Sequence, residues 1–397
     1  MLHFEITHDL SYRNYGRSLG GKILTDIIEY CERVDARSKR HVRSALTNGA
    51  TDGAHCLMSY LLDAEHITHQ AVVAMVGMAF PVYSSLMNRL GLEYVEIYDD
   101  QTIVPEIEVL FDAFERVRPA IIILALPHNP SGVMQNIEYY RAIMDWAAAN
   151  GSFVFVDRVC LMPWDNMTQL NQVFHPHVAD DRCFIIDSPS KSNSLAGIRL
   201  GLVLMGETHI EGFEKEIRCR SLNPAVFGST TFALCRLGNL CFHLGPKPAR
   251  RIARFMRRYL HMVYRQYPSD FVPPDVDCEA LIQTFVADYC KEVAILRKRI
   301  TVNQASIVDV LGEISDRSII LDGGFNVLVS SDKMKAANEV SDQQELASRH
   351  GVCVLTQRCF QSDPQDNGTY FLRLSLSVPE DGFRKALEVM KDYFDAA

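Results

Sequence analysis

The sequence predicts an α/β fold in which a three-layer αβα domain with a mostly parallel sheet precedes a smaller α+β domain. Two observations predict this fold. Over residues 1–230, short apolar runs rich in β-branched and aromatic residues alternate with amphipathic stretches. Beyond residue 231, long helical patterns lead to a C-terminal segment in which short strand patterns are followed by one more helix.

Five apolar runs have the length and composition of strands buried on both faces. They are Ala71–Met78, Ile121–Leu126, Ser152–Val156, Cys183–Ile186 and Leu200–Met205. Helical patterns lie between them, for example Glu138–Ala149, which ends at the cap signal Asn150-Gly151. Strands separated by helices indicate βαβ units and therefore a mostly parallel sheet.

The second half of the chain predicts a long helix over Leu281–Ile307 and a last helix over Glu380–Phe394. The strands expected there are Ser318–Leu321, Phe325–Ser330, Val352–Leu355 and Tyr370–Leu376. We expect a large domain over residues 15–285, with a helical insertion at about 245–277, and a small domain over residues 286–397, with residues 1–14 as a candidate addition to it.

The composition is that of an ordinary globular protein, with 48% hydrophobic and 22% charged residues. A net charge of −9 leaves no overall positive field for nucleic-acid binding. The 11 cysteines show no C-x-x-C pair and no zinc spacing, which favours reduced thiols and no metal. No apolar run is long enough for a bilayer, and the first residues lack a signal-peptide pattern. We therefore expect a cytoplasmic protein that binds neither nucleic acid nor membrane.

The strongest chemical feature is the motif Ser188-Pro-Ser-Lys191, directly after the predicted strand Cys183–Ile186. A lysine just past a strand end lies where α/β sheets bind ligands. Serine hydroxyls and Arg199 could bind a phosphate. A solvated lysine in a polar loop explains these residues equally well.

Two further strands end in polar side chains. Asn129-Pro-Ser-Gly132 follows Ile121–Leu126, and Asp157 follows Ser152–Val156. A turn or a cap explains either one alone. Because three strands bring Asn129, Asp157 and Lys191 to one rim, a functional site is the better explanation. The Gly-rich stretch 48–53 before a helical pattern is a weaker signal for an anion site.

Taken in order, these motifs resemble those of fold-type I pyridoxal 5′-phosphate (PLP) enzymes, specifically class I/II aminotransferases, from about Tyr15 to the C-terminus. The matching elements are the N-P-[ST]-G motif, the strand-end aspartate, the S-x-S-K motif, the arginine eight residues later and the R-[IL]-S pattern, which here are Asn129–Gly132, Asp157, Ser188–Lys191, Arg199 and Arg373–Ser375. The resemblance implies a fold-type I enzyme that uses PLP to transfer the amino group of an α-amino acid to a keto acid.

The resemblance also implies a role for each residue. Lys191 would bind the PLP aldehyde and then act as general acid and base. Asp157 would pair with the pyridinium nitrogen, and Asn129 would donate to the phenolic oxygen of the ring. Arg373 would bind the substrate α-carboxylate, unless it forms an interdomain ion pair instead. The phosphate would be held by Ala50, Thr51, Asp52, Ser188 and Arg199.

Two aromatic residues match the family less closely. Phe80, in Met78-Ala-Phe-Pro-Val-Tyr83, is aligned with the P-x-[YFW] aromatic that stacks on the cofactor, and a core phenylalanine is the alternative. Tyr15 matches a tyrosine that reaches the phosphate of the neighbouring subunit, which implies a homodimer. An ordinary surface tyrosine is the alternative there.

The sequence departs from the family at Cys160, where a tyrosine usually donates to the ring oxygen. This departure keeps open a second outcome on the same scaffold, namely elimination, cyclisation or oxidation of an amino acid. The arginines at 250, 254 and 258 form a basic helix face, which is either solvated or part of a lid or subunit contact. Arg358 is either a receptor for a second carboxylate or a surface charge. A PLP-sensing regulator is disfavoured because the chain has no basic helix-turn-helix segment.

Overall fold

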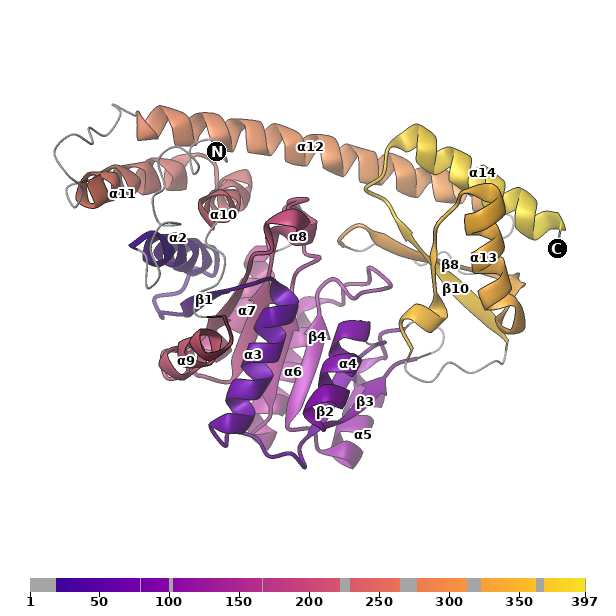
Figure 1. The fold of residues 1–397 in the computed structure, drawn as a ribbon, viewed down its shortest axis with the longest axis horizontal. Helices are drawn as coiled ribbons and strands as arrows, with labels where there is room; N and C mark the ends of the chain where they lie inside the picture. The colour runs from indigo at the N-terminus through magenta and orange to yellow at the C-terminus, as the bar shows by residue number, and fades with distance from the viewer. Residues whose placement is uncertain are drawn as a thin grey trace. The chain divides into compact units, whose positions relative to one another are not determined.

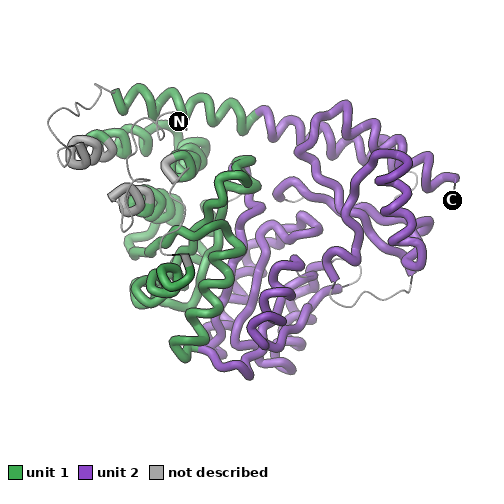
Figure 2. The backbone as a smooth tube through the Cα atoms, in the orientation of Figure 1, with its two compact units in different colours: residues 1–66, 166–294 green, residues 67–165, 295–397 purple. Residues whose placement is uncertain are grey.

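The computed structural model describes most of the chain, namely residues 19–78, 80–99, 103–165, 167–221, 229–264, 277–312, 323–361 and 368–396. Tyr15 and the predicted strand Ser318–Leu321 lie outside these residues. The chain forms two compact units, drawn in different colours in Figure 2: residues 1–66 with 166–294, and residues 67–165 with 295–397. The predicted division at residues 285 and 286 and the insertion at 245–277 stay predictions.

The fold is α/β, as predicted. A seven-stranded sheet has the order β1-β7-β6-β5-β4-β2-β3, and a three-stranded sheet has the order β8-β10-β9. Strand β2 pairs in parallel with β3 and β4, and β4 pairs in parallel with β5. Strand β7 is the exception, because it runs antiparallel to both β1 and β6. The sheet is therefore mostly parallel.

The first unit surrounds its strands with helices. Helix α3 contacts α9, and α2 contacts α7 and α10, so that helix pairs pack on the strands (Figure 1). Its elements are α2 (Leu19–Asp35), β1 (Arg43–Thr47), α3 (Ala50–Asp63), α7 (Met167–Ala179), β6 (Cys183–Asp187), α8 (Pro189–Ser192), β7 (Gly201–Met205), α9 (Ile210–Ser221), α10 (Ser229–Leu244), α11 (Lys247–Tyr264) and the first half of α12 (Cys278–Leu311).

The second unit holds the four parallel strands and the three-stranded antiparallel sheet. Side chains of α12, α13, α14, β8 and β10 form one of its apolar cores. Its elements are β2 (Val72–Val76), α4 (Pro81–Leu90), β3 (Glu93–Ile97), α5 (Ile107–Val117), β4 (Ile121–Ala125), α6 (Ile137–Asn150), β5 (Phe153–Asp157), β8 (Asn326–Lys335), α13 (Glu339–His350), β9 (Leu355–Thr356), β10 (Thr369–Ser375) and α14 (Glu380–Ala396).

The structure corrects the strand predictions at three places, namely two missed strands and one misplaced strand. Strands β1 and β3 were not predicted, because Arg43, Glu93 and Glu96 interrupt their apolar pattern. The predicted strand Val352–Leu355 is mostly irregular, and only its last residue belongs to β9. The predicted helix Glu138–Ala149 is confirmed as α6, which Gly151 ends in a left-handed conformation.

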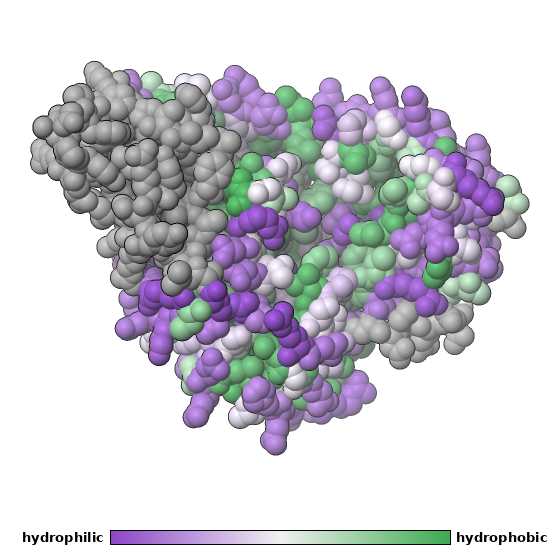
Figure 3. Space-filling model, viewed as in Figure 1, coloured by the Kyte–Doolittle hydropathy of each residue, from purple (hydrophilic) through white to green (hydrophobic). Residues whose placement is uncertain are grey.

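On the face drawn in Figure 3, apolar side chains lie among hydrophilic ones, as is usual for a globular surface. No helix in the described ranges combines the length and the apolar character that a membrane span requires.

Candidate active site

The predicted phosphate ligands lie at the start of α3 in the first unit. Gly49 precedes the helix with φ +98°, and because glycine has no side chain, no side chain caps the helix. The N–H groups of residues 50–52 precede the first helical hydrogen bond, from Gly53 N–H to the Gly49 carbonyl at 3.0 Å. A Cβ atom on Gly49 would lie 3.2 Å from Nη2 of Arg199. The guanidinium therefore lies beside a helix start that is electrostatically positive.

Close backbone packing brings these groups together. A Cβ atom on Gly201 would lie 2.5 Å from the carbonyl carbon of Gly49, so only glycine lets β7 start this close to α3. Ser188 donates its hydroxyl hydrogen to the carbonyl of Leu200 at 2.7 Å. This bond ties Ser188 to the residue that follows Arg199 in the sequence. Ser188 can donate to an anion only by giving up that carbonyl.

The carboxylate of Asp52 is turned away from the start of α3, so only its backbone N–H is left for the predicted phosphate. Its carboxylate turns back and accepts the N–H of Asn48 at 3.1 Å. The same carboxylate lies 3.8 Å from Nη2 of Arg220. Its negative charge is thereby partly neutralised away from the N–H groups that an anion would contact.

Lys191 lies in the short helix α8, whose N-cap is Ser188. The Ser188 hydroxyl accepts the N–H of Ser190 at 3.2 Å. The side chain of Lys191 is exposed, so its amine is accessible. The first unit thus brings Lys191, Ser188, Arg199 and the start of α3 into one connected region.

The second unit places the predicted ring-binding residues at the carboxyl ends of β4 and β5. These parallel strands pair Ala125 with Asp157, so their ends lie at the same edge. Asp157 accepts the hydroxyl hydrogen of Tyr83 at 2.8 Å and the N–H of Val159 at 3.0 Å. Burial, together with the negative charge of Asp157, raises the pKa of Tyr83 well above its usual value, so the phenol is neutral.

Tyr83 is a functional candidate that the sequence reasoning missed. Phe80 is 36% exposed at the N-cap of α4, whereas Tyr83 is 5% exposed and contacts Asp157. The pattern P-x-[YFW] also fits Pro81-Val82-Tyr83, and this reading would have found it. The role of Phe80 stays a prediction, but the structure favours Tyr83 as the aromatic residue beside Asp157.

Arg373, on β10, contacts Asn129. Its Nη1 donates to Oδ1 of Asn129 at 3.1 Å, and its guanidinium carbon lies 5.2 Å from the ring centroid of Phe360. Its buried Nε has no hydrogen-bond partner in the described part of the chain. Burial lowers the pKa of Arg373 from its high usual value. A buried guanidinium with a free donor suits a carboxylate ligand.

Cys160 is half-buried and lies near Tyr83 and Arg373. Arg358, in contrast, is engaged elsewhere. Its Nε lies 3.4 Å from Oε2 of Glu339, and its backbone N–H donates to Oε1 of the same residue at 2.6 Å. This pairing favours a structural charge over a receptor for a second carboxylate.

His128 is a second residue that the sequence did not single out. Its Nε2 lies 3.1 Å from the carbonyl of Met78, so this nitrogen carries the hydrogen. Its Nδ1 then accepts the hydroxyl hydrogen of Ser131 at 2.8 Å. Burial lowers the pKa of His128 to about 4 and keeps the ring neutral. The neutral ring ties the Asn129 loop to the end of β2.

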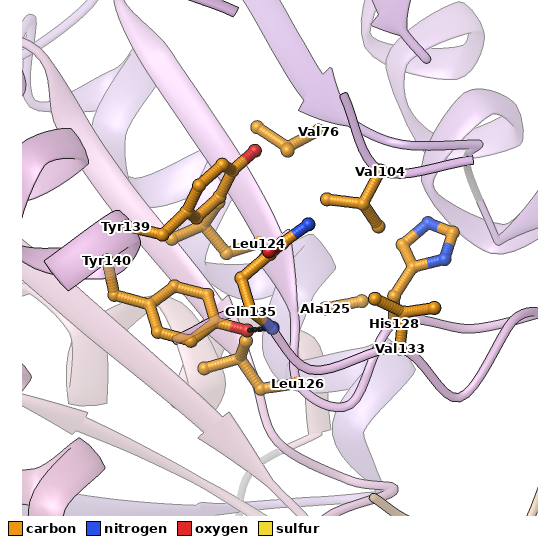
Figure 4. Close-up of a pocket in the computed structure, with 10 residues that line it drawn as sticks. All are labelled: Val76, Val104, Leu124, Ala125, Leu126, His128, Val133, Gln135, Tyr139 and Tyr140. Carbon is orange, nitrogen blue, oxygen red and sulfur yellow. Dashed lines mark hydrogen bonds between the residues drawn. The ribbon is translucent and has the colours of Figure 1, made fainter. Parts of the chain in front are cut away.

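His128 also borders a small, mostly apolar pocket behind this loop (Figure 4). The hydroxyl of Tyr140 accepts the N–H of Gln135 at 3.0 Å at its edge. None of the predicted site residues lines the pocket, and we assign it no function. Its lining residues are Val76, Val104, Leu124, Ala125, Leu126, His128, Val133, Gln135, Tyr139 and Tyr140.

The predicted basic face lies on α11. Arg250 and Arg254 are exposed, while the side chain of Arg258 lies outside the described residues. The neighbouring Arg251 places its guanidinium carbon 5.2 Å from the ring centroid of Tyr30. Exposure of the described members agrees with a solvated face.

Comparison with curated proteins finds aminotransferases. A probable aminotransferase of Mycobacterium tuberculosis is 36% identical over 90 residues, which cover 22% of this chain and 21% of that protein. Histidinol-phosphate aminotransferase 2 of Nitrosococcus oceani is 25% identical over 244 residues, 58% of this chain and 62% of that protein. Human alanine aminotransferase 1 is 26% identical over 160 residues, 38% of this chain and 32% of that protein. The matches span less than two thirds of each of these relatives.

Solved structures share the fold over the whole chain. A crystal structure of an aminotransferase from Mycobacterium tuberculosis has a TM-score of 0.68 at 18% identity and covers 100% of this chain and 87% of that one. The aromatic aminotransferase from Pyrococcus horikoshii has a TM-score of 0.70 at 15% identity, with 99% and 92% coverage. The family model for aminotransferase class I and II matches residues 46–390. The chain therefore belongs to the class I and II aminotransferase family.

Proposed function

We propose that the protein is a PLP-dependent aminotransferase that moves the amino group of an α-amino acid to a keto acid. The observation that carries the proposal is that the guanidinium of Arg199 lies beside the uncapped start of α3. Arg199 itself comes eight residues after Lys191. This arrangement suits a dianionic phosphate. It adds a structural reason to family membership.

The residues present fit PLP. In the first unit, Gly49 leaves room beside Arg199 that a side chain would fill, and Gly201 lets β7 start against the backbone of Gly49. In the second unit, the buried Nε of Arg373 has no hydrogen-bond partner among the described residues, which leaves a donor for the carboxylate of a substrate. Bound PLP would supply an electron sink for negative charge at the substrate Cα.

The chain's own residues then have separate tasks. The amine of Lys191 would hold the PLP aldehyde and later move a proton at the substrate Cα. Asp157 would hold a proton on the pyridine nitrogen, with the Tyr83 hydroxyl supporting its ionised form. N–H groups of residues 50–52 and Arg199 would hold the phosphate, with Ser188 as a further candidate.

Arg373 would both bind substrate and orient Asn129. Because Nη1 of Arg373 donates to Oδ1 of Asn129, the amide nitrogen of Asn129 remains as the group that can donate to the ring oxygen. The Nε of Arg373 remains for the substrate α-carboxylate. One contact thus supports two predicted roles.

Cys160 favours a second candidate outcome on the same scaffold. A thiol is a weak donor, so the ring oxygen would lose the partner that a tyrosine supplies. An enzyme altered in this way could direct the amino acid to elimination, cyclisation or oxidation. We further propose a cytoplasmic homodimer in which Tyr15 of each subunit reaches the other subunit's phosphate.

A reduction and product assay tests the proposal. Purified protein is incubated with PLP, treated with borohydride and digested, and we expect the reduced adduct on Lys191. The holoenzyme is then mixed with single amino acids, and we expect pyridoxamine 5′-phosphate and keto acid in equal amounts. A product other than the keto acid, with PLP regenerated, would support the second candidate. Absence of any adduct on Lys191, with Lys191→Ala behaving like wild type, would refute both.

A further inference from the structure

The segment that carries Lys191 is held at its upstream end by a buried charge network. Asp187, the last residue of β6, accepts the N–H of Ser188 at 2.7 Å through Oδ1. Its Oδ2 lies 3.3 Å from Nη1 of Arg236, on α10. Arg236 also donates through Nη2 to Glu32, on α2. The three ionic side chains are no more than 6% exposed.

The same segment is held at its downstream end by a tyrosine. Asn193 donates its amide hydrogen to the hydroxyl oxygen of Tyr289, on α12, at 2.9 Å. Tyr289 in turn donates to Oδ1 of Asn239, on α10. A Cβ atom on Gly238 would overlap Cδ1 of Tyr289, so the glycine makes room for the ring. The tyrosine bridges the segment and α10.

Both contacts converge on one face of α10. Arg236 and Asn239 are three residues apart in the helix, so their side chains lie on the same side. Figure 1 shows α8 close to α10 and to the first half of α12, in agreement with these contacts. We call the pair of contacts, Arg236 to Asp187 and Tyr289 to Asn193, the α10 clamp.

The clamp is costly to break because its groups are buried. Burial alone would lower the pKa of Arg236, but the carboxylates of Glu32 and Asp187 raise it above its usual value. Arg236 therefore stays charged. Burial raises the pKa of Tyr289 above its usual value, so its hydroxyl stays a donor. The hydrogen bonds from Asn193 to Tyr289 and from Tyr289 to Asn239 point in one direction, which strengthens both.

The segment between the two contacts has little regular structure of its own. Helix α8 is only four residues long, and just beyond Asn193 the chain leaves the helix through Ser194, which has a φ angle of 55°. A lysine that holds an aldehyde and later moves a proton must be placed accurately, because a misplacement of about 1 Å can cost about 100-fold in rate. The accurate placement of Lys191 therefore depends on contacts that the segment makes with the rest of the first unit.

We propose that Arg236 and Tyr289 are positioning residues that fix the Lys191 segment through Asp187 and Asn193. Neither acts on substrate directly. This inference rests on the proposed function, because it assigns a purpose to the accurate placement of Lys191. It goes beyond that function by naming residues on α10 and α12 that no motif marks.

Tyr289→Phe is the decisive variant because it removes one hydroxyl and keeps the ring that packs against Gly238. We expect hydrogen exchange in the peptide covering residues 187–195 to become about tenfold faster, while helices α2 and α7 exchange at the wild-type rate. We expect kcat to fall about tenfold and KM for the amino acid to change less than about twofold. The pH profile of PLP absorbance at Lys191 should also shift.

Tyr139→Phe is the matched control. Tyr139 is also a buried tyrosine whose hydroxyl is hydrogen-bonded, here to the carbonyl of Pro105 at 3.0 Å, and it belongs to the other unit. We expect it to leave exchange at 187–195, kcat and the absorbance profile unchanged. The pair Tyr289→Phe and Asn193→Ala should be non-additive in kcat, because both remove the same hydrogen bond.

Arg236→Lys tests the upstream contact. It keeps a positive charge but cannot reach Glu32 and Asp187 together, so exchange should rise first around Ser188. Loss of folding in this variant would leave Tyr289→Phe to decide. The clamp is refuted if Tyr289→Phe matches wild type in exchange and kcat, or if exchange rises equally in α2, α7 and 187–195.

Failure of the proposed function has a different signature. If wild-type protein forms no reducible adduct with PLP at Lys191, the function is wrong whatever the variant does. If wild type forms the adduct and Tyr289→Phe exchanges and turns over like wild type, only the clamp is wrong.

Discussion

At the scale of single residues, the hydroxyl of Tyr83 on Asp157 carries a clear prediction. Tyr83→Phe removes a hydrogen bond that stabilises the Asp157 carboxylate. Asp157 should therefore hold the proton on the pyridine nitrogen less effectively. We expect kcat to fall about tenfold and stability to fall by about 2 kcal/mol, because one hydrogen bond to a charged group is lost. Steady-state kinetics and urea unfolding measure the two effects.

Phe80→Leu is the companion variant for Tyr83→Phe. Phe80 is the more exposed of the two aromatic residues, so we expect less than about a threefold change in kcat. A larger loss in Phe80→Leu than in Tyr83→Phe would instead return the aromatic role to Phe80.

Arg373 carries the second residue-scale prediction. Arg373→Lys keeps the charge but loses the planar fork, so it cannot contact Asn129 and a substrate carboxylate together. We expect KM for the amino acid to rise about 100-fold. Arg358→Lys is the control, because Arg358 pairs with Glu339, and its KM should stay near wild type. An equal rise in both variants would contradict the carboxylate role.

The candidate site residues that the sequence predicts all belong to local motifs, and their roles stay predictions. Asn129 follows β4, Asp157 ends β5, Lys191 follows β6, and Arg199 comes eight residues after Lys191, just before β7. Arg236 and Tyr289 have no such signal. Their partners lie 49 and 96 positions away in the chain, and a buried polar contact over that distance leaves no local pattern.

At the scale of elements, apolar runs predicted most of the buried strands and missed β1 and β3. Strands β2, β4, β5, β6 and β7 read as apolar runs because helices or neighbouring strands cover them. Strand β3 includes Glu93, which is exposed, so its alternation is too weak to detect. The antiparallel direction of β7 depends on pairing with β1 and β6, which no run of residues specifies.

The start of α3 carries an element-scale prediction. Gly49→Ala would place a methyl group 3.2 Å from Nη2 of Arg199 and force a non-glycine residue into φ +98°. We expect a loss of about 1–2 kcal/mol in stability and a rise of about tenfold in the Kd for PLP. Equilibrium dialysis gives the Kd, and urea unfolding gives the stability.

Gly351→Ala separates backbone strain from the loss of the anion site. Gly351 has φ +68° at the end of α13, and its Cβ position faces open space. Gly351→Ala should lose about as much stability as Gly49→Ala and keep the wild-type Kd for PLP. A raised Kd in both variants would show that strain alone weakens PLP binding.

At the scale of the whole molecule, two buried groups give the stability opposite dependences on pH. Burial raises the pKa of Asp165 from 3.8 to about 6, although the N–H groups of Met162 and Gly324 donate to its carboxylate. The folded state therefore binds the extra proton between these values, so this contribution to stability falls as pH rises from 4 to 6. Burial lowers the pKa of His128 from 6.5 to about 4, so its contribution rises over nearly the same window. The two slopes oppose each other.

Asp165→Asn should expose this compensation. The variant loses the falling contribution of Asp165, while the contribution of His128 is the same in both proteins. The stability of the variant relative to wild type should therefore increase between pH 4 and pH 7. A shift of about two pKa units corresponds to about 3 kcal/mol, which is the largest increase expected. Urea unfolding at several pH values measures the difference, and taking wild type as the reference cancels the other titrating groups. Because the amide oxygen of the substituted side chain can still accept the N–H of Gly324, the contact itself is retained. A pH-independent difference would show that Asp165 titrates alike in the folded and unfolded chain.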